Sequence, residues 1–86
     1  MPRALTMQRS IVPLGDRKKF LERLRARRQY FTGANCQFWA FEESDLPGAY
    51  VEFIEASDER TLAAAVSGAP EHLIEAVRIY HEVELK

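Results

Sequence analysis

The chain has 86 residues, 47% of them hydrophobic, and a formal net charge of -1. A domain of this size buries only roughly 60% of its unfolded surface, so we expect one domain, residues 1–86, that depends on a partner for part of its stability. The single Cys36 excludes an intrachain disulfide framework. Neither a secretory signal nor an apolar run of the ~20 residues that span a membrane is present, so we expect a cytoplasmic protein without a membrane partner.

Charge is unevenly divided along the chain. Residues 1–35 carry a net charge of +7, and residues 36–86 carry one of -8. A basic segment is typical either of phosphate binding or of a solvated helix face. No glycine-rich phosphate loop or RNA-binding signature accompanies it, and the acidic half would repel a polyanion. We therefore expect a solvated face, partly paired with the acidic half, and no nucleic-acid partner. Seven residues form the basic segment: Arg17, Lys18, Lys19, Arg23, Arg25, Arg27 and Arg28.

The first half of the chain predicts a strand followed by a helix. Apolar and polar side chains alternate over residues 4–12, which favours a strand. The sequence PLG ends this strand, and Asp16 is a residue type that caps helices. A helix is expected from there to about Phe31, with an exit turn at residues 32–35. Its apolar stripe, flanked by Arg17 and Arg28, contains Phe20, Leu21, Leu24 and Phe31.

The second half predicts a hairpin, a helix and a last strand. Strands at about 35–42 and 49–56 are joined by EESDLPG, whose proline and glycine favour a turn. Residues 57–59 begin a second helix, which SGAP interrupts and Pro70 resumes. The inward residues of these helical segments are expected to be Leu62, Ala65, Val66, Leu73, Ile74 and Val77. A strand over Ile79–Leu85 closes the chain.

The predicted order is therefore βαββαβ. This order indicates an α+β, ferredoxin-like domain, in which a four-stranded antiparallel sheet carries both helices on one face. If residues whose numbers sum to about 91 face each other in the hairpin, Phe38 pairs with Phe53 and Trp39 with Glu52. One face of the hairpin would then pack under the helices. The other would carry Gln37, Trp39, Phe41, Tyr50, Glu52 and Ile54, a set too apolar to remain in water.

Two segments carry a family resemblance. The pattern IVPLGDRKKFLERLRARR, followed by FWAFEESDLPGAYVEFIEASDERTL, resembles the antibiotic biosynthesis monooxygenase-type members of the dimeric α+β barrel superfamily, over roughly residues 5 to 66. The resemblance implies a homodimer in which two sheets pack face to face into a barrel. The second aromatic face would be covered by the partner's sheet, and any remaining lumen would be lined by Trp39, Tyr50 and Glu52.

Five residues are the candidate ligand-binding group: Trp39, Tyr50, Glu52, Arg9 and His81. Trp39 and Tyr50 would stack on or hydrogen-bond an aromatic ring, Glu52 would act as a base after desolvation, and Arg9 would hold an enolate or phenolate. His81 would be an acid or base near neutral pH if it faced the lumen. Each residue also has a structural alternative. Trp39 would form the dimer core, and Tyr50 would use its hydroxyl at the interface edge. Arg9 would pair with Glu52 or Glu55 across strands.

We expect neither a metal nor a cofactor. No group of histidine, cysteine and carboxylate residues has zinc spacing. The haem-degrading relatives in the superfamily need an axial histidine on the second helix, whereas His72 falls near the expected break in that helix.

Three functions remain open on the sequence. The first is a homodimeric barrel of unassigned reaction that binds a small apolar or aromatic molecule in its lumen. The second is a cofactor-independent monooxygenase that acts on a small aromatic or polyketide-like substrate. The third is an interaction module that uses the basic first helix. A lumen with room for a ring and converging polar groups would favour the first two.

Overall fold

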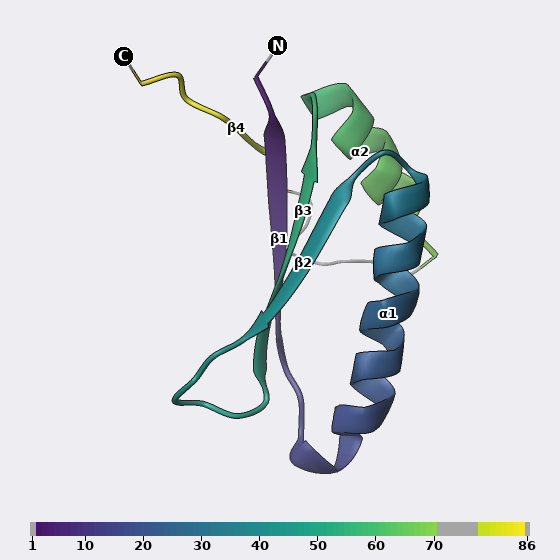
Figure 1. Ribbon diagram of the computed structural model, residues 1–86, viewed down its shortest axis with the longest axis vertical. Coiled ribbons are helices and arrows are strands. Elements are labelled where there is room, and N and C mark those ends of the chain that lie inside the picture. Colours follow the sequence, from purple (N-terminus) through teal and green to yellow (C-terminus); the bar gives the residue numbers. More distant parts are fainter. Residues whose placement is uncertain (1, 71–77, 86) are drawn as a thin grey trace.

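One antiparallel sheet with both helices on the same side forms the architecture of the protein, as Figure 1 shows. The computed structural model describes residues 2–70 and 78–85. The strands follow the order β2-β3-β1-β4 across the sheet, so β3 and β1 are central. The predicted α+β, ferredoxin-like order is confirmed. The elements are β1 (Ala4–Ile11), a 3-10 turn η1 (Leu14–Asp16), α1 (Arg17–Gly33), β2 (Gln37–Glu42), β3 (Ala49–Ala56), α2 (Glu59–Ser67) and β4 (Tyr80–His81).

The two helices begin differently. Asp16 occupies the position before α1, but its side chain makes no capping hydrogen bond. Asp58 caps α2, because its Oδ1 accepts a hydrogen bond of 2.7 Å from the backbone N–H of Thr61. Leu62 and Ala65 are buried in α2, as predicted, whereas Val66 is partly buried and packs against the core. The expected second helical segment, with Leu73, Ile74 and Val77 inward, lies outside the described residues.

The last strand is shorter than predicted. The sequence indicated a strand over Ile79–Leu85, whereas β4 contains Tyr80 and His81 alone. These two residues pair with Leu5 and Ala4, and a final hydrogen bond of 2.7 Å joins the N–H of Glu82 to the carbonyl oxygen of Arg3. The ladder stops there because β1 begins at Ala4, which leaves no strand opposite residues 83–85. The apolar side chains in that tail are exposed.

The hairpin register differs by one residue from the prediction. Phe38 pairs with Ile54 and Trp39 with Phe53, so paired numbers sum to 92 and not 91. Two tight turns in the connecting loop account for this difference. The N–H of Leu46 donates to Glu43 and the N–H of Ala49 donates to Leu46, which leaves Glu42 inside the strand. A shift of one residue moves every side chain of β3 to the opposite face relative to β2.

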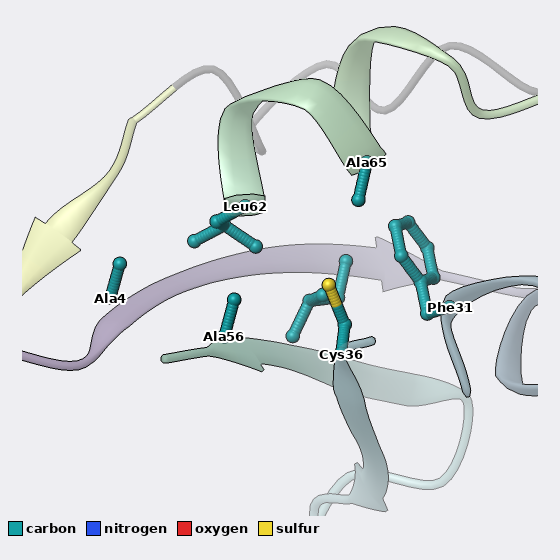
Figure 2. Packing of buried hydrophobic residues seen from close by; sticks show 7 residues of the cluster. Ala4, Phe31, Cys36, Ala56, Leu62 and Ala65 are labelled. Carbon is teal, nitrogen blue, oxygen red and sulfur yellow. The ribbon is translucent and has the colours of Figure 1, made fainter. Parts of the chain in front are cut away.

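The core is a thin apolar layer between the sheet and the helices. Its main cluster contains Ala4, Phe31, Cys36, Ile54, Ala56, Leu62 and Ala65, which Figure 2 displays between α2 and the central strands. A second cluster under the first half of α1 contains Phe20, Leu24 and Tyr50. The Cys36 thiol is reduced and buried, and burial raises its pKa above the ordinary value. This environment makes the Cys36 thiolate scarce, as in a structural cysteine.

Candidate functional site

The sheet presents two chemically different faces. Directly paired residues of antiparallel strands point to the same side, so the registers define rows across the sheet. One row on the side away from the helices is Trp39–Phe53–Met7, and the next is Phe41–Val51–Arg9. We call this side the outer face, and its apolar members are Leu5, Met7, Ile11, Trp39, Phe41, Val51 and Phe53. Ile11 and Phe41 are 77% and 56% exposed, so this apolar face is open to water in the single chain.

A buried ion pair lies on the helix side of the sheet. Nη1 of Arg27, on α1, donates hydrogen bonds of 2.7 and 2.6 Å to the two carboxylate oxygens of Glu52, on β3. The Glu52 side chain is fully buried, and 9% of the Arg27 side chain is exposed. Glu52 shares its row with Ala40 and Gln8. The pair therefore joins the helix layer to the centre of the sheet.

A second polar group lies nearer the loop end of the same layer. Nη1 of Arg17 donates to both carboxylate oxygens of Glu42 at 2.8 Å and contacts the Tyr50 hydroxyl at 2.6 Å. The hydrogen bond from Arg17 is the main cause of a lowered pKa at Glu42. The backbone N–H of Gly48 donates a second hydrogen bond to the Glu42 carboxylate, which lowers this pKa further. Burial is the leading cause of a raised pKa at Tyr50. Arg17 and Arg27 thus confirm the expected pairing of the basic helix with the acidic half of the chain.

The structure separates the predicted ligand-binding residues. Trp39 and Arg9 lie on the outer face, whereas Tyr50 and Glu52 lie on the helix side. The prediction that Trp39, Tyr50 and Glu52 line one lumen is therefore wrong, because it rested on the register that the hairpin loop does not adopt. Of the two glutamates expected to pair with Arg9 across strands, Glu52 lies on the opposite face of the sheet, whereas Glu55 lies on the same face as Arg9.

His81 is placed apart from these groups. His81 is opposite Ala4 and lines a small hollow of about 230 Å³ at the edge of the sheet. The other histidine, His72, falls outside the described residues. Among residues 2–70 and 78–85, no three histidine, cysteine or acidic side chains are grouped so as to hold a metal ion.

Two larger concavities border the sheet. A hollow of about 490 Å³ on the outer face lies beside the β2–β3 loop. A cleft of about 310 Å³ lies between α1 and the edge strand β2. The hollow is lined by Arg9, Ser10, Ile11, Phe41, Glu42, Glu43, Leu46, Ala49, Tyr50 and Val51. The cleft is lined by Leu21, Leu24, Arg25, Arg28, Phe38, Trp39 and Ala40.

Arg27 is the residue that the sequence interpretation missed. The buried side chains of α1 are Phe20, Leu24, Arg27 and Phe31, which follow the 4-3-4 spacing of an apolar stripe. Arg27 therefore occupies an apolar position, and this spacing was the available signal that its charge would meet a buried carboxylate. The expected flanks of the stripe were Arg17 and Arg28.

Comparison with known proteins supports the fold. The structure superposes on a mutant of SnoaB, a cofactor-independent oxygenase from Streptomyces nogalater, with a TM-score of 0.71. The aligned region covers 95% of this chain and 90% of SnoaB, at 17% sequence identity. The chain has the fold of SnoaB. The resemblance to the monooxygenase-type α+β barrel proteins is thereby confirmed at the level of the fold.

The sequence comparisons give no further guidance. No protein-family model matches the chain, and no curated protein matches it. In the part of the chain that the structure describes, no helix combines the length and the apolar character needed to cross a bilayer.

Proposed function

We propose that this protein is a homodimer whose paired sheets form an α+β barrel that binds a small apolar or aromatic molecule. The observation that carries the proposal is the outer face, because a sheet with apolar side chains on both faces must cover both. Both helices of the described residues, α1 and α2, lie on one face. A second copy that presents the same apolar face would cover the other, and twofold pairing is the commonest symmetry of soluble oligomers.

The fold similarity supports this arrangement. The structure superposes on SnoaB over nearly the whole chain, and this fold belongs to the barrel-forming class that the sequence resembles. A small domain also gains more from association than a large one, because its own core is limited. We also place the protein in the cytoplasm, where a reducing environment would keep the Cys36 thiol free.

The ligand would bind in the hollow beside the β2–β3 loop. Apolar side chains form much of its wall, and Arg9 supplies a cation that would meet a carbonyl or phenolate oxygen. Trp39 would support the site from the neighbouring row of the outer face. Tyr50 borders the hollow from β3, whereas the buried Glu52 would hold the sheet to α1 through Arg27.

Light scattering coupled to size-exclusion chromatography tests the dimer. We expect a mass of about twice 9.9 kDa at micromolar concentration. A monomer over the whole accessible concentration range would contradict the proposal. Ligand binding is then measured by calorimetry with small phenols, and Arg9→Gln is expected to weaken binding by about tenfold. Arg60→Gln, on exposed α2 surface, is the matched control.

The similarity to SnoaB favours one second candidate, a cofactor-independent oxygenase. In such a reaction an electron-rich substrate loses a proton, and its anion reacts directly with O2. Conversion of a substrate CH2 group to a carbonyl releases four electrons, so one oxygen atom enters the product and the other leaves as water. Glu52 is not the base in this scheme, because its buried carboxylate already accepts two hydrogen bonds from Arg27. Oxygen consumption with phenolic substrates, compared between the protein and Arg9→Gln, tests this candidate.

A further inference from the structure

The cleft between α1 and β2 is separate from the hollow near Arg9. β2 is an edge strand, so its outer side has no neighbouring strand to close the space beneath α1. The resulting volume of about 310 Å³ matches the lower end of small-molecule pockets, which run from about 300 to 1,000 Å³. Such a volume admits one aromatic ring with a short chain.

Apolar side chains from α1 and β2 line part of the cleft. Leu24 is buried on α1 and Leu21 lies half-buried beside it. Phe38 forms part of the opposite wall from β2, and its ring stacks 6.1 Å from the ring of Phe31 at an interplanar angle of 5°. This contact packs Phe38 against Phe31 of the core. Trp39 and Ala40 continue the wall along β2.

Two cations lie at the rim. Arg25 and Arg28 line the cleft from α1 and are one helical turn apart. Arg17 and Arg27 of the same helix form ion pairs with Glu42 and Glu52, respectively. In contrast, neither Arg25 nor Arg28 makes an ion pair or hydrogen bond with the described residues. Guanidinium groups in this position provide planar donors for a carboxylate.

We propose that this cleft binds a small amphipathic anion, an aromatic or short-chain carboxylate. The apolar part of the ligand lies between the leucines of α1 and Phe38, and its carboxylate pairs with Arg25 and Arg28. The site adds a second binding position to the one near Arg9, and it requires no catalysis. Trp39 is common to the cleft and the outer face, whereas Arg25 and Arg28 line the cleft and not the hollow near Arg9.

Titration with 4-phenylbutyrate tests the proposal directly. Trp39 is the only tryptophan in the chain, so its fluorescence reports on the cleft wall. Amide chemical shifts locate the ligand independently, and we expect the largest changes at residues 21–28 and 38–40. 4-Phenylbutanol has the same apolar part without the charge, and we expect it to bind at least about tenfold more weakly.

Paired substitutions separate specific recognition from general attraction to a basic helix. Arg25→Gln with Arg28→Gln is expected to weaken 4-phenylbutyrate binding at least about tenfold, while the exposed positions preserve the fold. Lys18→Gln with Lys19→Gln removes the same charge from exposed positions of α1 outside the cleft, and we expect nearly unchanged binding.

Several results would overturn the proposal. One is the absence of a saturable fluorescence change up to about 10 mM 4-phenylbutyrate. Another is equal binding of 4-phenylbutyrate and 4-phenylbutanol, or equal weakening of binding by the two double variants. The last is a set of amide shift changes confined to the outer face. A shift pattern around Arg9 would support the hollow of the proposed function and reject the cleft, so the two sites are distinguished by the same spectra.

Discussion

Arg27 and Glu52 form a buried ion pair between α1 and the central strand β3, with both carboxylate oxygens within 2.7 Å of the same guanidinium nitrogen. The two residues are 25 positions apart in the chain. Removing a carboxylate and a guanidinium from water is costly unless each compensates the other. The pair therefore fixes which part of α1 lies over which row of the sheet, and each partner is needed mainly because the other is present.

Substitution of one partner should be strongly destabilising. We expect Glu52→Gln to lower the free energy of unfolding by about 3–5 kcal/mol, because it leaves the Arg27 charge buried without a carboxylate. Urea unfolding followed by circular dichroism measures this change. Arg27→Met with Glu52→Leu serves as the control and should stay within about 1 kcal/mol of the natural protein. Equal destabilisation by the single and double variants would show that packing, and not charge pairing, dominates.

Trp39→Ala should weaken the proposed dimer. Trp39 is 41% exposed in the single chain and is in a row with Phe53 and Met7 on the outer face. Loss of a central aromatic residue typically costs an interface at least about 2 kcal/mol, or about thirtyfold in the dissociation constant. Analytical ultracentrifugation over a dilution series measures it. Gln29→Ala, exposed on α1, is the control, and an unchanged dissociation constant for Trp39→Ala would place the interface elsewhere.

Stability should depend on the ionisation of Glu42. The hydrogen bond from Arg17 holds the folded pKa of Glu42 below its ordinary value of 4.5. The folded state then binds this proton more weakly than the unfolded chain does. Ionised Glu42 therefore contributes fully to the free energy of unfolding above about pH 4.5. This contribution is lost as the pH falls through the lower pKa of the folded state.

Comparison of Glu42→Gln with the natural protein isolates this effect. The difference in unfolding free energy should be constant from about pH 7 to pH 5.5 and should shrink below pH 4.5. Chemical denaturation at each pH measures it, and Glu43→Gln in the adjacent loop position is the control. A difference that stayed constant down to about pH 3 would mean that the Arg17 contact does not persist in solution.

Gly48→Ala should destabilise the hairpin. Gly48 has a φ of 95°, and a Cβ atom there would lie 2.5 Å from the carbonyl oxygen of Val12. Both the backbone conformation and the contact oppose a side chain, so we expect a loss of about 1–3 kcal/mol in unfolding free energy. Thermal unfolding compares it with Gly33→Ala, where a Cβ would meet no atom within 4 Å. Equal stability of the two variants would contradict the hairpin geometry.

Local sequence signals were sufficient for the element order. Alternation predicted β1, helical spacing predicted α1, and Asp58 marked the start of α2. These signals depend on neighbours a few residues apart, so they can be interpreted without the fold. The length of β4 did not follow from its sequence, because a strand also requires a partner, and β1 provides none beyond Arg3.

The sequence by itself determined the order βαββαβ and the presence of two apolar sheet faces, because both follow from periodicity along the chain. Only the tertiary structure decided which side chains share a face. β2 carries aromatic residues on both sides, and β3 places apolar side chains in both alternating sets, so a shift of one residue changed little in local apolar content. The turns of the β2–β3 loop set the register of the hairpin. Arg27, on α1, makes the burial of Glu52 possible because it pairs with the carboxylate. Those two long-range relationships moved Tyr50 and Glu52 away from Trp39 and divided the predicted site between the two faces of the sheet.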